Sequence, residues 1–221
     1  MGPIVRALVD CWPDAHRRGA IVVVDDGSRD DTVRAARDAG ALVVCHGSNR
    51  GKGAALRTGL RVAHRLGFRA AVTLDADGQH APEDAARLAG MTVDGRALVL
   101  GVRDLAAEGA PWANRFSNGI SNVFLSAFTA RALADTQCGL RRYPVDATLA
   151  LEGRANGYAY EAEVLLLAAR AGLPIVQVPV RALYGGAERF THFDPVRDPA
   201  RIVARVLLTL ARPRPVAAYA T

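Results

Sequence analysis

Lysine and cysteine are both scarce in this 221-residue sequence. Lys52 is the only lysine among 28 lysine and arginine residues, so the positive charge is almost entirely arginine. Arginine suits bidentate contacts with carboxylates and phosphates, although a bias in codon usage would give the same count. The three cysteines, Cys11, Cys45 and Cys138, are too few and too scattered for a disulfide framework or a zinc site. Their scarcity predicts a protein of a reducing compartment.

Long hydrophobic runs are also missing. No apolar run reaches the roughly 18 residues that suggest a membrane span, and Asp10 and Trp12-Pro13-Asp14 interrupt the N-terminal segment before a signal peptide could form. We therefore expect a cytoplasmic protein, with peripheral contact at the cytoplasmic membrane face as a further option. Aromatic residues make up only 6% and the arginines are spread out, so the net charge of +6 does not predict nucleic-acid binding. An apolar content of 50% excludes a disordered chain.

Short apolar runs alternate with helical segments through the first half of the sequence. This alternation predicts an α/β protein with a mostly parallel sheet, helices on both faces, and a single domain over residues 1–221. Ligands of such sheets bind beyond the carboxyl ends of the strands. The predicted strands are residues 20–24, 41–45, 70–74, 97–101 and, at a sheet edge, 175–180; the predicted helices of the second half are residues 114–130, 158–171 and 197–211.

Asp75-Ala76-Asp77-Gly78-Gln79 follows the third predicted strand. Two carboxylates and an amide oxygen at alternate positions can converge on one point. Hard divalent cations prefer oxygen ligands, and Mg²⁺ is commonly held by one or two carboxylates together with substrate phosphates. The motif therefore indicates an enzyme whose substrate is a diphosphate. The alternative is an acidic cap for the helix that opens at Pro82, and the motif by itself does not decide between them.

Two further turns follow predicted strands. The segment Gly47-Ser48-Asn49-Arg50-Gly51-Lys52-Gly53 differs from a Walker A loop, but glycines before a helix N-terminus suit an anion such as a phosphate. Asp25 and Asp26 could accept hydrogen bonds from a ribose hydroxyl or a base. At both turns the alternative is a plain turn that opens the next helix.

Together these motifs resemble the family 2 glycosyltransferases, which have the GT-A fold, and look most like the polyprenyl-phosphate branch, the dolichyl-phosphate mannose synthase-like enzymes. The resemblance implies an inverting transfer of a sugar from a nucleoside-diphosphate sugar to a polyprenyl phosphate or to another hydroxyl acceptor. The matching segments stand in family order over nearly the whole chain. They are residues 23–28 with Asp31-Thr32, then 49–55, 74–80, 101–103, 135–141, 160–163 and 191–193 with Arg197-Asp198.

The resemblance also implies roles for individual residues, with residues 1–101 as the nucleotide-sugar half and residues 102–221 as the acceptor half. The donor-binding residues would be Asp25, Asp26, Lys52, Asp75, Ala76, Asp77 and Gln79, of which Asp75, Asp77 and Gln79 would hold Mg²⁺ or Mn²⁺. The acceptor-binding residues would be Arg103, Arg115, Asn118, Ser121, Asp135, Gln137 and His192. The catalytic residues would be Asp77, Arg141 and Glu161, although a phosphate acceptor is already ionised and needs no general base.

The sequence departs from the family at its start. Family members open with a strand that contacts the nucleotide, whereas Met1 lies about where their first helix begins. We therefore expect an unpaired strand edge beside residues 20–24. Three explanations stay open: a start site further upstream, a strand from a partner subunit, and a chain that has lost full donor binding. A homo-oligomer could cover the open edge. The alternative function is a catalytically impaired, nucleotide-binding remnant of such an enzyme, or a partner-dependent subunit.

The C-terminal helix carries arginines at helical spacing. Arg197, Arg201, Arg205 and Arg212 fall on one side of a helical wheel, as expected for an interfacial helix against anionic lipid. An ordinary surface helix packed on its own domain shows the same pattern, and we favour that interpretation.

Overall fold

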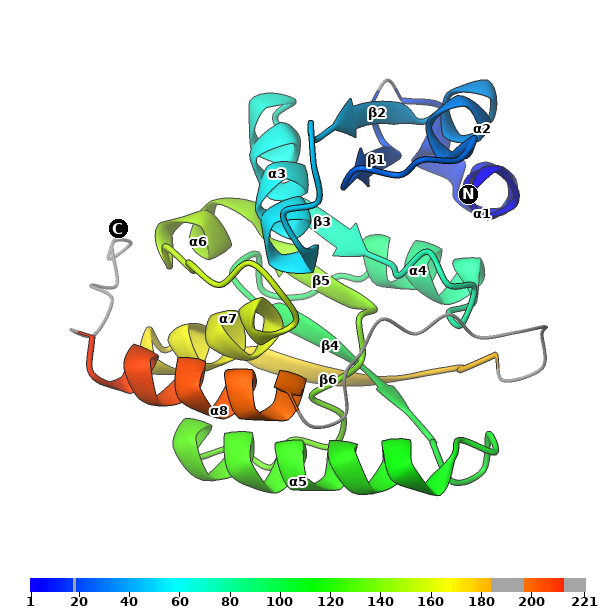
Figure 1. Ribbon diagram of the computed structural model, residues 1–221. Helices are drawn as coiled ribbons and strands as arrows, with labels where there is room; N and C mark the ends of the chain where they lie inside the picture. The colour runs from blue at the N-terminus through cyan, green and yellow to red at the C-terminus, as the bar shows by residue number, and fades with distance from the viewer. Residues whose placement is uncertain (18, 184–196, 213–221) are drawn as a thin grey trace.

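The computed structural model describes residues 1–17, 19–183 and 197–212, with the side chains of residues 197–202 left out. Figure 1 shows an α/β architecture in which helices lie on both sides of the strands. No helix within this part of the chain has the length and apolar composition that crossing a bilayer requires. In chain order the elements are α1 (Gly2–Cys11), η1 (Pro13–His16), β1 (Val22–Asp25), α2 (Thr32–Asp38), β2 (Leu42–Cys45), α3 (Lys52–Arg65), β3 (Ala70–Thr73), α4 (Pro82–Ala89), β4 (Leu98–Arg103), α5 (Trp112–Thr129), β5 (Arg141–Pro144), α6 (Val145–Ala150), α7 (Ala159–Arg170), β6 (Ile175–Val180) and α8 (Arg197–Leu210).

The larger sheet has four strands in the order β3-β5-β4-β6. Strand β6 lies at the edge of this sheet, as predicted for residues 175–180. It runs parallel to β4. Strand β5 is antiparallel to both of its neighbours and was not predicted from the sequence. Its residues Arg-Arg-Tyr-Pro include no β-branched side chain, so only long-range pairing identifies the segment as a strand.

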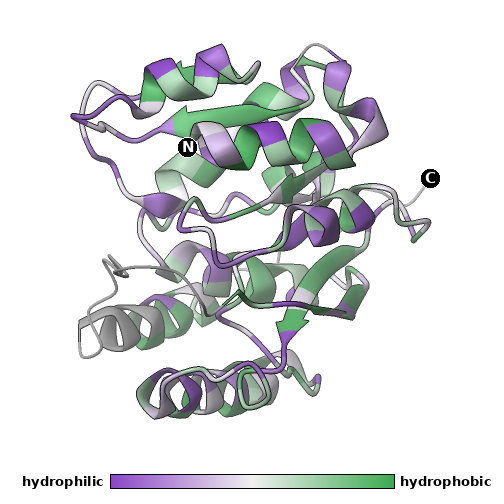
Figure 2. Cartoon of the chain, turned by 90° about the vertical axis from the view of Figure 1, so that its right-hand side faces the viewer, coloured by the Kyte–Doolittle hydropathy of each residue, from purple (hydrophilic) through white to green (hydrophobic). Residues whose placement is uncertain are grey.

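Strand β4 shows how the core is divided between the two faces of this sheet. Leu98 and Leu100 belong to a cluster that includes most of α7, whereas Val99 belongs to a second cluster with Leu88 of α4. Side chains of a strand alternate between faces, and here both faces are apolar because helices cover both. Figure 2 shows hydrophobic residues along the strands, with hydrophobic and hydrophilic residues alternating along the helices.

Strands β1 and β2 form a separate parallel pair. The backbone N–H of Leu42 donates to the carbonyl of Ile21. The backbone hydrogen-bonding groups of the odd residues of β1 therefore point toward β2, and those of Val22 and Val24 point away from it. A cavity of about 640 Å³ is lined by residues of β1 and β3 and by residues of the helices α1, α3 and α4. The structure thus contains the unpaired edge that the sequence predicts beside residues 20–24.

Of the four arginines considered above, the two whose side chains the structure describes face the protein, and the side chains of Arg197 and Arg201 lie outside the described part. Arg205 and Arg212 turn toward Glu163 of α7, with nitrogen–oxygen distances of 4.0 and 3.2 Å. The fully buried Glu163 carboxylate also accepts the backbone N–H groups of Arg154 and Ala155, both at 2.7 Å. The described arginines therefore attach α8 to the domain, which agrees with the favoured interpretation.

We expect Glu163→Ala to lower the free energy of unfolding by about 3 kcal/mol, because it removes the buried acceptor of the Arg154 and Ala155 backbone N–H groups and the partner of Arg212. Urea unfolding measures the change. Asp31→Ala is the control, because its ion pair with Arg34 is exposed and contributes at most about 1 kcal/mol. Equal effects of the two variants would contradict this account of how α8 is anchored.

Candidate active site

Three charged side chains meet beyond the carboxyl end of β3. The Lys52 ammonium lies 2.8 Å from Asp75 Oδ1 and 2.9 Å from Glu161 Oε2. Lys52 is the first residue of α3, Asp75 follows β3, and Glu161 lies in the first turn of α7. One cation therefore joins two carboxylates that come from distant parts of the sequence.

The charges of this cluster support one another. Burial alone would lower the pKa of Lys52, but the carboxylates of Glu161 and Asp75 outweigh it and raise that pKa above its ordinary value. Burial alone would raise the pKa of Asp75, and the Lys52 ammonium outweighs it so that the pKa is lowered. Both groups are consequently charged at neutral pH.

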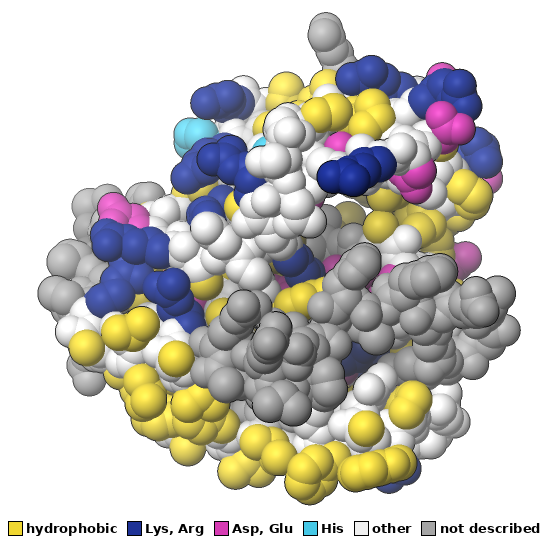
Figure 3. Space-filling model, in the orientation of Figure 1, with side chains coloured by type: hydrophobic (Ala, Val, Ile, Leu, Met, Phe, Trp, Pro, Cys, Tyr) yellow, Lys and Arg dark blue, Asp and Glu magenta, His cyan; other side chains and the backbone are white. Residues whose placement is uncertain are grey.

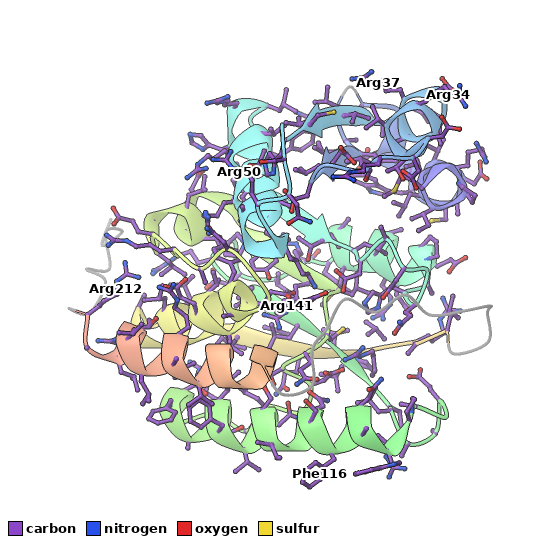
Figure 4. The ribbon with its side chains drawn as sticks, viewed as in Figure 1. Arg34, Arg37, Arg50, Phe116, Arg141 and Arg212 are labelled. Atoms are coloured by element: carbon purple, nitrogen blue, oxygen red, sulfur yellow. The ribbon has the colours of Figure 1, made fainter. Side chains whose placement is uncertain are left out.

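Arg141 supports the cluster from beneath and is fully buried at the centre of the molecule (Figure 4). Its guanidinium donates hydrogen bonds to the backbone carbonyls of Cys138, Thr136 and Glu161, at 2.8, 2.6 and 3.1 Å. Its Nε also lies 3.9 Å from Glu161 Oε1. Arg141 therefore positions the backbone around the site.

Three of the buried polar atoms that lack hydrogen-bond partners among the described residues belong to predicted site residues or to a direct neighbour of one. They are Glu161 Oε1, Asn118 Oδ1 and His80 Nδ1. Burial lowers the pKa of His80, which favours its neutral form. Unpaired buried polar atoms are costly unless a bound molecule satisfies them, so these atoms suit a ligand.

Asp75 occupies space that only a glycine leaves open. A Cβ atom placed on Gly139 would lie 2.1 Å from Asp75 Oδ2. The sequence motif around Gly139 therefore has a steric role that was not predicted.

Asp77 and its neighbours form an exposed turn beside the cluster. Asp77 Oδ1 accepts the backbone N–H of Gln79 at 3.0 Å, and Ala76 is exposed. In the described part of the chain, no three His, Cys, Asp or Glu residues are grouped as a metal site. Two carboxylates and an amide nevertheless form a donor set that fits Mg²⁺ or Mn²⁺ when substrate phosphates complete the coordination.

Asp25 and Asp26 hold the turns that follow β1 and β2. Asp26 accepts the backbone N–H groups of Arg50 and Gly51 at 2.9 and 2.7 Å, and lies 2.6 Å from His46 Nδ1. Burial opposes the ionised form of Asp26, but the hydrogen bonds from His46, Arg50 and Gly51 lower its pKa overall. The backbone N–H groups of Arg50 and Gly51 thus bind the Asp26 carboxylate. This agrees with the alternative that residues 47–53 form a plain turn before the helix.

Asp25 accepts the backbone N–H groups of Gly27 and Ser28. His46 was not predicted as part of this arrangement, although its place directly after β2 was a usable signal. Its Nε2 lies 2.9 Å from Thr58 Oγ1, so it connects Asp26 to α3.

Several of the predicted acceptor residues lie in β4, in α5 and in the segment before β5. Arg103 binds Asp135 through both carboxylate oxygens, with Nε–Oδ2 and Nη2–Oδ1 distances of 2.7 and 3.0 Å. This pairing was not predicted, and it orients the Arg103 guanidinium.

The inward face of α5 completes this region. Ser121 lies 2.8 Å from Thr136 Oγ1, and Ser117 accepts a hydrogen bond from Gln137 at 3.1 Å. Asn118 is buried, whereas Arg115 is exposed near the start of the helix. His192 lies outside the described residues.

Comparison with known proteins shows the family of this chain. The family model for glycosyl transferase family 2 matches residues 7–145. The chain belongs to that family. The enzyme is a glycosyltransferase, as the resemblance implies.

Two curated relatives are similar to this glycosyltransferase over most of its length. An uncharacterised protein of Methanocaldococcus jannaschii is 32% identical over 170 residues, which cover 74% of this chain and 70% of the relative. A UDP-N-acetylglucosamine–dolichyl-phosphate N-acetylglucosaminyltransferase of Methanococcus voltae is 30% identical over 194 residues, which cover 76% of each chain.

The glycosyltransferase also resembles solved structures. Glucosyl-3-phosphoglycerate synthase from Mycobacterium tuberculosis, in complex with Mn²⁺, UDP and glucosyl-3-phosphoglycerate, gives a TM-score of 0.71 at 22% identity. The match covers 96% of this chain and 77% of that chain. The expected GT-A fold is thereby confirmed.

We expect Gly139→Ala to lower the free energy of unfolding by about 2 kcal/mol, because the added methyl group displaces the Asp75 carboxylate from Lys52. Gly95→Ala is the matched control, since a Cβ there meets no atom within 4 Å. Thermal unfolding of both variants makes the comparison. A Gly139→Ala protein as stable as the control would show that Asp75 does not depend on this space.

Proposed function

We propose that this glycosyltransferase moves a sugar from a nucleoside-diphosphate sugar to the phosphate of a polyprenyl phosphate, with inversion at the anomeric carbon. An acceptor phosphate oxygen forms the new bond to that carbon as the bond to the leaving diphosphate breaks. The observation that carries the proposal is the Lys52–Asp75–Glu161 cluster at the carboxyl ends of the strands. It places charged groups where donors of α/β enzymes bind.

Residues 1–101 would bind the donor. Asp25 and Asp26 hold the turns on which the nucleotide would rest, and Lys52 keeps Asp75 ionised. A Mg²⁺ or Mn²⁺ ion held by Asp75, Asp77 and Gln79, beside Ala76, would offset the negative charge that grows on the leaving diphosphate.

Residues 102–221 would bind the acceptor. Arg103, fixed by Asp135, and the exposed Arg115 would hold the acceptor phosphate. Asn118, Ser121 and Gln137 would add polar contacts from α5 and its neighbouring segment, with His192 as a further contact. Because a phosphate is already ionised, its attack needs no proton to be removed.

Glu161 and Arg141 would act on the sugar. Glu161 Oε1, which has no hydrogen-bond partner among the described residues, can accept a hydrogen bond from a sugar hydroxyl. Arg141 would hold the Glu161 backbone in place. Glu161 would thus orient the donor sugar without serving as a general base.

The names of several relatives support the acceptor. Besides the Methanococcus voltae enzyme, an undecaprenyl-phosphate mannosyltransferase of Micrococcus luteus is 31% identical over 180 residues, covering 76% of this chain and 73% of the relative. Both names specify a polyprenyl phosphate.

The donor assignment is tested by thermal unfolding with UDP-, GDP- and dTDP-sugars, each with and without Mn²⁺. We expect one nucleotide sugar to stabilise the protein by about 2.7 kcal/mol at a hundredfold excess over its dissociation constant, and only with Mn²⁺. Asp77→Ala should lose this stabilisation, while the exposed Asp38→Ala, distant in sequence from the motif, should keep it.

Transfer to undecaprenyl phosphate is then measured with the stabilising donor, and NMR of the product gives the anomeric configuration. Retention of configuration would contradict inversion. If no nucleotide sugar stabilises the protein with Mn²⁺, the metal-dependent transferase is wrong and the nucleotide-binding remnant is favoured.

A further inference from the structure

Helix α5 exposes a continuous apolar stripe. Trp112, Phe116, Ile120 and Val123 are spaced by four, four and three residues, which places them on one helical face. Their exposed fractions are 74%, 63%, 56% and 74%. Hydrophobic side chains gather over α5 along the lower edge of the molecule in Figure 3, and Phe116 points away from the body in Figure 4. These four residues are called the α5 stripe below.

The fold does not need this stripe. The opposite face of α5 is already buried through Asn118, Leu125 and Thr129. Exposed apolar patches of this kind mark interaction surfaces on soluble proteins, and a Trp–Phe pair with ring centroids 6.3 Å apart stands at its start.

Helix α8 adds apolar surface on the same side of the molecule. Val203, Leu207 and Leu208 are 40%, 53% and 62% exposed, whereas Arg205 and Arg212 lie toward Glu163. Figure 1 shows α5 and α8 together on the lower side, and Figure 2 agrees.

The charges around the stripe favour a lipid surface over a second copy of the chain. Neither α5 nor residues 203–212 contain an aspartate or a glutamate. Arg115, next to the stripe, and Arg131, just after the helix, are exposed. Pairing two such faces about a twofold axis would bring like charges together with no acid between them. Anionic headgroups complement the arginines, and an acyl layer accepts the aromatic and aliphatic side chains.

We propose that the α5 stripe is a membrane-docking surface that inserts into the boundary between headgroups and acyl chains of an anionic bilayer. Its purpose rests on the proposed function, since a polyprenyl phosphate is itself a membrane lipid. Helix α5 contacts both the acceptor region and the solvent. Ser117 and Ser121 contact Gln137 and Thr136 on the inward side, and the α5 stripe faces outward. Docking through this helix brings the lipid phosphate to the arginines that would bind it.

The test is co-sedimentation of the full chain with vesicles of phosphatidylcholine, alone or mixed with phosphatidylglycerol. We expect binding to the mixed vesicles that weakens at high salt, and much weaker binding to phosphatidylcholine alone. The triple variant Trp112→Ser, Phe116→Ser, Val123→Ser should bind at least about tenfold more weakly, because it removes the largest exposed apolar groups. Circular dichroism confirms that it is folded.

The control removes exposed apolar side chains elsewhere. Leu42 and Leu66, both at the outer end of the β1–β2 unit beside Gly19, are 38% and 37% exposed. The double variant Leu42→Ser, Leu66→Ser should bind vesicles like the unaltered protein. Equal loss in both variants, or no binding of the unaltered protein to anionic vesicles, would overturn the proposal. So would a stable dimer in solution that the triple variant dissociates.

Activity separates this proposal from the proposed function. The triple variant should lose transfer to undecaprenyl phosphate in vesicles and keep transfer to a short-chain, water-soluble polyprenyl phosphate. Absence of transfer to either acceptor, with vesicle binding intact, would refute the proposed acceptor and leave the docking surface standing. Equal activity of the variant and the unaltered protein on vesicle-borne acceptor would overturn the surface alone.

Discussion

The ammonium group of Lys52 is the interaction on which the candidate site depends. Asp75 and Glu161 would repel each other at this distance without a cation between them, and Lys52 lies within 3 Å of both. The contact joins the start of α3, the turn after β3 and the first turn of α7. Gly139 leaves room for one carboxylate, and Arg141 fixes the backbone of the other. The scarcity of lysine in this chain thus has a counterpart in structure, since its only lysine stands at this point.

The second half of the molecule links the site to its surface. Asp135 orients Arg103, and the inward hydroxyls of α5 bind the segment that contains Asp135. The outward face of the same helix is apolar. Glu163 holds the α8 segment in a similar way. Arg205 and Arg212 lie toward its carboxylate, and Leu207 and Leu208 are exposed to solvent. Buried polar partners, Thr136 for α5 and Glu163 for α8, therefore lie on the inward faces of these helices.

Sequence patterns predicted the strands β1 to β4 well because each is a short apolar run bounded by turn residues. They failed at β5, whose residues carry no strand signature and whose pairing bridges β3 and β4 across long stretches of chain. The motifs also placed the candidate site at the carboxyl ends of the strands. They did not predict the Arg103–Asp135 pair, the steric role of Gly139 or the contact of His46 with Asp26, since each is a contact between residues distant in sequence.

The sequence by itself determined the α/β class and the family resemblance, because these follow from local periodicity and from short motifs in a fixed order, and the resemblance in turn implied the unpaired edge beside residues 20–24. Only the tertiary structure decided which charges pair and which faces are exposed. On a helical wheel, the arginines of α8 and the apolar residues of α5 can face either solvent or the protein. Their orientation depends on a buried partner such as Glu163 or Thr136, and packing alone brings that partner into reach.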